Sequence, residues 1–95
     1  MADVTDVQHA ASDITVTVRF FAAARDAAGV DETEIRLPEG ATLADLTAVL
    51  AVREGPLGQV LRKCSYLRDG FAVRDPGVEL RSGQTIDVLP PFAGG

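Results

Sequence analysis

The sequence ends in DVLPPFAGG, and this stretch carries its clearest candidate for a reactive group, the free α-carboxylate of Gly95. A carboxylate resists nucleophiles because its charge repels them and oxide is a poor leaving group. It must first be activated, typically as an acyl-adenylate formed by a separate ATP-using enzyme. Gly94 and Gly95 have no side chains, so the final backbone can enter a narrow enzyme channel. Pro90 and Pro91 lack amide donors and favour an extended chain, so we expect them to end the last strand and to project the tail.

The other reactive side chains form no catalytic or metal-binding motif. His9 is the only histidine and Cys64 the only cysteine, so we expect no metal site of the Cys or His type. No serine lies in a nucleophile motif, and the sequence contains no phosphate-binding loop motif. Cys64 falls between an apolar helical segment and a strand, where a buried structural thiol is commoner than a nucleophile. We therefore expect no catalysis by the chain alone.

Length and charge narrow the class of protein. The 95 residues make one domain with a modest core. The net charge of −5, without a cluster of basic residues, argues against nucleic-acid binding and suits a basic protein partner. One cysteine cannot form an intramolecular disulfide, and no signal peptide or apolar stretch of membrane-spanning length is visible. We expect a cytoplasmic protein that does not contact the membrane.

The elements that must position the tail begin with ITVTVRFF, residues 14–21, whose period-two alternation predicts a half-buried strand. Its inward residues are Ile14, Val16, Val18 and Phe20. Phe21 is the exception, because it is apolar and falls on the polar face. AAARDAAG then predicts a short helical turn with Gly29 as a left-handed cap, and ETEIRL predicts a second strand.

The main helix is expected in TLADLTAVLA. Thr42 and Asp45 resemble a capping box with Asp in place of Glu. One helical face then carries Leu43, Leu46, Val49 and Leu50. Gly55 and Pro56 are expected to end this helix, and PLGQVL allows one further short helical segment.

The second half of the chain predicts strands. SYLRDGFAVR divides into two short strands joined at Asp69 and Gly70, a dipeptide favoured in tight hairpins. DPGVELRSGQ is rich in turn residues. TIDVL predicts the last strand, on which Leu89 is a second apolar residue on the polar face. The order of elements predicts an α+β domain, a β-grasp with a mixed sheet and one main helix packed on one face.

A β-grasp places its first and last strands parallel at the centre of the sheet. Phe21 and Leu89 would then lie side by side on the helix-free face, extended by Phe92 into an apolar surface for a protein partner. The alternative is that each is one of the isolated exposed apolar side chains common on proteins. We divide the chain into a flexible arm (1–12), the β-grasp domain (13–89) and an extended tail (90–95).

The pairing of VRFFAAARDAAG near the start with VELRSGQTIDVLPPFAGG at the end resembles the ubiquitin-like sulfur carriers of the MoaD/ThiS family. Within that family the sequence is most similar to the small subunits of molybdopterin synthase. The resemblance covers residues 14–95. It departs from the family pattern in the arm 1–12, an extension without an assigned function, and in SYLRDGFAVR, which lacks the Val-Asn that often opens the corresponding hairpin.

This resemblance implies a chemistry and a set of partners. An E1-like enzyme would use ATP to adenylate the Gly95 carboxylate, and a sulfur-donor protein would supply the sulfur that converts it to a thiocarboxylate. The sulfur would then pass to cyclic pyranopterin monophosphate in the large subunit of molybdopterin synthase, as part of a heterotetramer. Two rounds would install the dithiolene of molybdopterin. No tightly bound cofactor is implied for this chain.

Residue by residue, the resemblance implies that Gly94 and Gly95 form the reactive terminus and that Phe21 and Leu89 contact partner proteins. Arg25 matches the polar residue after the Phe-Phe strand, although a solvated charge is an equal alternative. Other functions stay open: a carrier for thiazole, cysteine or another thiolated metabolite, a modifier attached to lysines, or a β-grasp interaction module with a silent terminus.

Overall fold

Five strands form one mixed sheet in the order β2-β1-β5-β3-β4. The computed structural model describes residues 13–53 and 55–91. In chain order the elements are β1 (Asp13–Phe20), α2 (Ala22–Ala28), β2 (Glu32–Pro38), α3 (Leu43–Arg53), α4 (Gly55–Leu61), β3 (Ser65–Arg68), β4 (Phe71–Val73) and β5 (Thr85–Leu89). The predicted arm 1–12 and the tail residues 92–95 lie outside the described residues.

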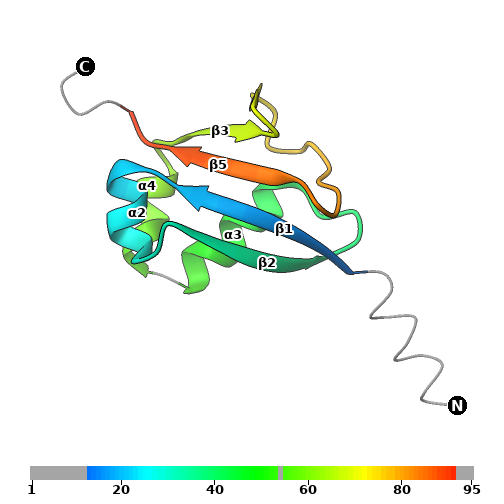
Figure 1. Ribbon diagram of the computed structural model, residues 1–95, viewed down its shortest axis with the longest axis horizontal. Coiled ribbons are helices and arrows are strands. Elements are labelled where there is room, and N and C mark those ends of the chain that lie inside the picture. The colour runs from blue at the N-terminus through cyan, green and yellow to red at the C-terminus, as the bar shows by residue number, and fades with distance from the viewer. Residues whose placement is uncertain (1–12, 54, 92–95) are drawn as a thin grey trace, which may run out of the picture.

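The first and last strands lie side by side at the centre of the sheet, as predicted (Figure 1). β1 pairs parallel with β5, with Val18 opposite Ile86 and Phe20 opposite Val88. β1 pairs antiparallel with β2 on its other side, and β5 pairs antiparallel with β3. This is the ubiquitin-like β-grasp arrangement that the sequence predicted.

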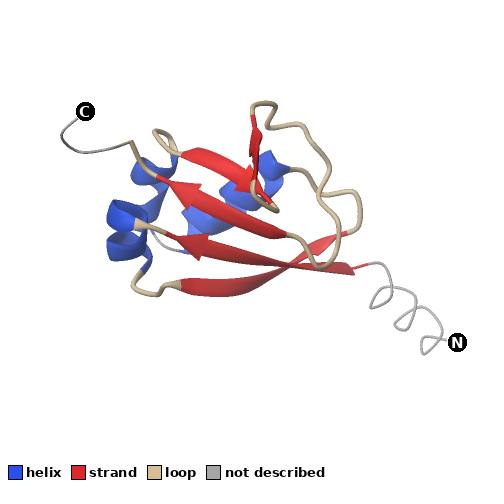
Figure 2. Ribbon diagram, turned by 45° about the horizontal axis from the view of Figure 1, so that its top comes forward, coloured by secondary structure: helices blue, strands red, loops and turns tan. Residues whose placement is uncertain are grey.

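In the described part of the chain, α2, α3 and α4 cover the same face of the sheet, and no helix lies on the other, open face (Figures 1 and 2). The alternation in β1 explains this, because every second residue is buried against the helices while Thr15, Thr17 and Arg19 face the open side. Ile86 and Val88 of β5 and Leu46 of α3 are fully buried in the same core. The polar and apolar sides of β1 and β5 therefore separate as the period-two pattern indicates.

Local signals in the sequence set the ends of several elements. Gly29 ends α2 in the left-handed region (φ 81°), and its N–H donates to the Arg25 carbonyl over 2.8 Å. The capping box is formed in both directions: the Thr42 N–H donates to Asp45 Oδ2 over 2.9 Å, and the Asp45 N–H donates to Thr42 Oγ1 over 3.2 Å. The end of α2 and the start of α3 are therefore set by hydrogen bonds between residues three or four positions apart.

The predicted hairpin is present between β3 and β4. Asp69 (φ 49°) and Gly70 (φ 88°) both occupy the left-handed region, which a tight hairpin of this kind requires. The turn is also attached to the sheet, because the Asp69 N–H donates to the Thr85 carbonyl over 2.8 Å and the Thr85 N–H donates to Asp69 Oδ1 over 2.9 Å.

Two features differ from the sequence-based expectation. β1 ends at Phe20, and Phe21 is the extended N-cap residue of α2 (φ −124°, ψ 149°) rather than the last residue of the strand. The turn-rich segment before β5 also contributes to the core, since Leu80 is 1% exposed and its N–H donates to the Ala41 carbonyl over 2.8 Å. Because this segment is rich in turn residues, its sequence did not indicate that Leu80 is buried.

Candidate functional site

The ends of β1 and β5 meet at one edge of the molecule, from which the chain continues into its tail (Figure 1). Phe21 continues the pairing beyond β1, because its N–H donates to the Val88 carbonyl over 3.3 Å. The parallel register therefore makes Phe21 and Leu89 neighbours across the two strands, as predicted. Phe21 is 40% exposed and Leu89 is half-buried, so both offer apolar surface to a partner.

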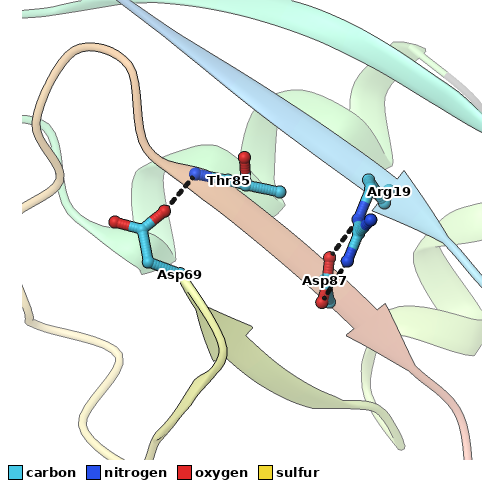
Figure 3. A network of polar contacts seen from close by, with 4 residues as sticks. All are labelled: Arg19, Asp69, Thr85 and Asp87. Atoms are coloured by element: carbon cyan, nitrogen blue, oxygen red, sulfur yellow. Dashed lines mark hydrogen bonds and ion pairs between the residues drawn. The ribbon is translucent and has the colours of Figure 1, made fainter.

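A charged pair lies next to this apolar edge on the open face of the sheet. Arg19 of β1 and Asp87 of β5 are opposite each other in the register and form a two-pronged ion pair (Figure 3). Arg19 Nε donates to Asp87 Oδ1 over 2.7 Å, and Nη2 donates to Oδ2 over 3.0 Å. The Asp87 side chain is only 9% exposed, whereas that of Arg19 is 48% exposed. The pair fixes the relative position of the two central strands.

Arg19 connects the ion pair to the apolar edge. Its guanidinium carbon lies 5.6 Å from the centroid of the Phe21 ring, which is within cation–π range. The hydrogen bonds to Asp87 raise the pKa of Arg19, with the charge of Asp87 adding to the effect and the charge of Glu32 contributing less. Arg19 therefore contacts both Asp87 of β5 and the Phe21 ring.

Sequence reasoning missed Arg19, Asp87 and Leu67 as parts of this surface. Leu67 of β3 is half-buried and opposite Asp87, so it lies on the other side of β5 from Arg19. The polar face of each strand could be predicted from the sequence. Which residues of β1 and β5 are opposite one another depends on a register that pairs positions 68 residues apart. Alternation alone does not supply that register.

Of the remaining predicted site residues, only Arg25 lies in the described part of the chain. Arg25 is exposed on α2 and forms a long ion pair with Asp31, with 3.7 Å between Nη1 and Oδ1. β5 ends at Leu89, directly before Pro90, as the two prolines predicted, and Pro91 is exposed. The predicted site residues Phe92, Gly94 and Gly95 lie outside the described part of the chain, and their roles stay predictions.

The structure does not present Cys64 as a nucleophile. The Cys64 thiol is half-buried and donates to the Val60 carbonyl over 3.2 Å, and burial raises its pKa, whereas an activated cysteine needs a lowered one. The neighbouring Tyr66 hydroxyl donates to the Leu61 carbonyl over 2.9 Å, and burial raises its pKa to about 12. Both residues support the junction between α4 and β3.

Residues 13–53 and 55–91 contain neither a cluster of metal-binding side chains nor a membrane-spanning helix. Within these ranges, no group of three or more His, Cys, Asp or Glu side chains is close enough to hold a metal ion. None of the helices in the same ranges has the length and apolar character that crossing a bilayer requires.

A mixed five-stranded sheet with helices on one face defines this chain as a ubiquitin-like β-grasp protein, and comparison with known proteins gives its family. The model of the ThiS family matches residues 18–95, and the chain therefore belongs to the ThiS family. The sequence is 32% identical over 81 residues to the molybdopterin synthase sulfur carrier subunit of Chlamydomonas reinhardtii, covering 84% of this chain and 98% of that protein.

Solved structures share the same fold. A Pyrococcus furiosus protein, assigned provisionally as subunit 1 of molybdopterin converting factor, superposes with a TM-score of 0.76 at 32% identity, covering 83% of this chain and 99% of that one. Small archaeal modifier protein 1 of Haloferax volcanii superposes with a TM-score of 0.75 at 21% identity, covering 83% and 99% of the two chains. A complex of subunits 1 and 2 of molybdopterin-converting factor from Helicobacter pylori superposes with a TM-score of 0.62 at 24% identity, covering 86% and 100%.

Proposed function

We propose that this chain is the sulfur carrier and small subunit of molybdopterin synthase. The observation that carries the proposal is the ThiS-family match, which extends to Gly95, together with the identity to a molybdopterin synthase sulfur carrier subunit over nearly the whole of that relative. The end of β5 at Leu89 supports it, because the next residues are the prolines that start the tail.

The proposed chemistry takes place on the terminal carboxylate. A carboxylate oxygen of Gly95 attacks the α-phosphorus of ATP in an E1-like enzyme, and pyrophosphate leaves. The outer sulfur of a protein persulfide then attacks the carbonyl carbon, and the bond to AMP breaks. A thiol next attacks the donor's sulfur in the resulting acyl disulfide, so the donor leaves as a disulfide with that thiol and the thiocarboxylate remains on Gly95. Activation by adenylation is needed because oxide is a poor leaving group and AMP is a good one.

The large subunit is the proposed site of sulfur transfer to cyclic pyranopterin monophosphate. There the thiocarboxylate sulfur attacks a carbon of the precursor and displaces an oxygen group from it. Water then hydrolyses the bond between that sulfur and the Gly95 carbonyl, so the sulfur stays on the precursor and the carrier ends the cycle as a carboxylate ready for reactivation. This chain supplies the sulfur and the docking surface, while the large subunit supplies the substrate pocket. Phe21 and Leu89, held at one edge by β1 and β5, are the proposed contacts with partner proteins, together with Phe92 and Arg25.

A single-turnover assay tests the pathway. The thiocarboxylated chain is mixed with a molybdopterin synthase large subunit and the pyranopterin precursor, and the intact mass of the chain is followed. We expect the mass to fall by about 16 Da as sulfur is replaced by oxygen, with dithiolene product formed in step. Loss of the sulfur only to a thiazole or cysteine precursor with its own enzyme would assign the chain to another branch of sulfur carriers.

A further inference from the structure

The outer edge of β2 is a free hydrogen-bonding surface. β2 is the first strand in the sheet order, and among residues 13–53 and 55–91 only β1 pairs with it (Figure 1). The Phe20 N–H donates to the Asp31 carbonyl over 2.8 Å, and bonded pairs alternate along antiparallel strands. Alternate residues of β2 therefore bond to β1, and those between them, Glu32, Glu34 and Arg36, direct their N–H and C=O groups outward.

This edge has few of the features by which proteins protect exposed strands. The pairing with β1 runs without a bulge from Asp13 opposite Pro38 to Arg19 opposite Glu32. The only proline of β2 is its last residue, Pro38, and the strand contains no lysine. Bulges, internal prolines, covering elements and charged side chains, especially lysine, are the usual means of blocking edge pairing. Of these, the described residues show only the charged side chains of Glu32, Glu34 and Arg36. The edge of β2 is therefore a regular template on which another strand can pair.

A cavity of about 210 Å³ lies beside this edge on the helix side of the sheet. Its walls come from β1, α2, β2, the turn before β2, α3 and α4. Thr33 and Arg53 are its polar lining residues, and its apolar ones are Phe20, Ala28, Val30, Ile35, Leu50 and Leu57. Val30 is 48% exposed, so the apolar lining reaches the surface. A strand that paired with β2 would direct every second side chain to this side, where the cavity can receive an aliphatic group.

The opposite side of the same edge carries Glu32, Glu34 and Arg36, so it is acidic at the end formed by Glu32 and Glu34. Glu32 and Glu34 are opposite Arg19 and Thr17 in the register, so their side chains lie on the open face of the sheet. Glu32 is near Arg19, but that guanidinium is already bound to Asp87. Within the described ranges, the salt bridges do not include Glu32 or Glu34. An added strand with lysine or arginine on this side would pair with both carboxylates.

We propose that the free edge of β2 binds an extended segment of a partner protein as a sixth strand, with aliphatic side chains in the cavity beside Ile35 and basic side chains against Glu32 and Glu34. The net charge of −5 also favours a basic partner. β1 separates this edge from β5, so the binding does not depend on sulfur chemistry at the tail.

The test uses the full chain, labelled with ¹⁵N and carrying its ordinary carboxylate, and a nine-residue peptide that alternates lysine with valine. We expect the amide signals of Glu32, Glu34 and Arg36, together with Val30 at the mouth of the cavity, to shift on titration. Two control peptides are used: one alternates glutamate with valine, and the other has the lysines and valines of the first peptide in separate blocks. Both should bind at least tenfold more weakly.

Two matched charge reversals complete the test. Glu34→Lys should weaken binding of the lysine–valine peptide roughly three- to thirtyfold and strengthen binding of the glutamate–valine peptide, because one cross-strand charge pair is reversed. Glu39→Lys changes the net charge equally but lies in the exposed turn after β2, and it should alter affinity less than twofold.

Both side chains are exposed, so both variants should keep the dispersed spectrum of a folded domain. Four results would overturn the proposal: no shifts at β2, equal binding of the blocked peptide, equal effects of the two charge reversals, or shifts confined to the surface of Phe21 and Leu89. Self-association through β2 without any peptide would also overturn it, because the occupant would then be a second copy of the chain.

Discussion

At the scale of single residues, the open face of the sheet is organised around Arg19. Its guanidinium is bound to Asp87 on the neighbouring strand and lies over the ring of Phe21, so one side chain joins the strand pairing to the apolar edge. The sequence was sufficient to single out Phe21 and Leu89, because large apolar residues at polar positions stand out in an alternating pattern. It was not sufficient for Arg19 and Asp87, which are unremarkable as surface charges until the parallel register pairs them.

Replacing Phe21 with alanine separates docking from stability. Phe21 is partly exposed, so Phe21→Ala should cost about 1 kcal/mol of unfolding free energy, while affinity for the activating enzyme or the large subunit should fall at least tenfold. Leu46→Ala, in the fully buried core, is the control and should cost about 2–5 kcal/mol. Urea unfolding and titration calorimetry measure the two effects. A larger loss of stability than of affinity would make Phe21 a core residue.

The ion pair predicts an unequal response to losing either partner. Arg19→Ala should destabilise the domain more than Asp87→Ala, because the first leaves a buried carboxylate without its cation and the second leaves a half-exposed guanidinium that water can solvate. Arg25→Ala, which removes the exposed 3.7 Å pair with Asp31, should change unfolding free energy by less than about 0.5 kcal/mol. Urea unfolding of the three variants gives the order, and equal losses for Arg19 and Asp87 would contradict this explanation.

At the scale of elements, caps and turns could be predicted from neighbouring residues, whereas burial that depends on distant parts of the chain could not. The left-handed cap at Gly29, the reciprocal Thr42 and Asp45 bonds and the hairpin turn at Asp69 each depend on neighbouring residues, so their sequence patterns were informative. Leu80 lies in a segment rich in turn residues and is buried because the chain bonds there to Ala41, nearly forty positions earlier, which no local pattern indicates.

The contribution of Gly29 to the end of α2 can be tested by replacing Gly29 and, as a control, Gly55 with alanine. Gly29→Ala should lower unfolding free energy by about 1 kcal/mol, because an added methyl group meets no neighbour and the cost comes from the left-handed backbone alone. Gly55→Ala at the start of α4 also has open space around the added methyl group, but its φ lies outside the left-handed region, so it should be neutral or slightly stabilising. Thermal unfolding compares them, and similar losses at both positions would argue against backbone strain at Gly29.

At the scale of the whole molecule, the β-grasp fold pairs its first strand, β1, with its last strand, β5. The parallel pairing of β1 with β5 places the first strand beside the last one, so the proposed docking residues Phe21 and Leu89 lie at the edge where β5 continues into Pro90 and Pro91. The fold could be predicted because the order of elements restricts the topology. The proposed docking surface could be predicted only in outline, since the positions of its charged residues depend on the register.

The terminus should be separable from the fold. Adding one residue after Gly95, or deleting Gly95, should abolish sulfur transfer while changing unfolding free energy by less than about 0.5 kcal/mol, because the described core is complete by Leu89. Transfer assays and urea unfolding on the same samples measure the two properties. A matched loss of stability would mean that the terminus contributes to folding.

The most direct test of the proposed function is the intact mass of the chain after incubation with ATP, an E1-like activating enzyme and a sulfur donor. Conversion of the Gly95 carboxylate to a thiocarboxylate should add about 16 Da, the difference between sulfur and oxygen, and the gain should require ATP. The chain lacking Gly95 should show no gain. An unchanged mass of the full chain with every activating enzyme tried would contradict a sulfur carrier and favour a β-grasp interaction module with a silent terminus.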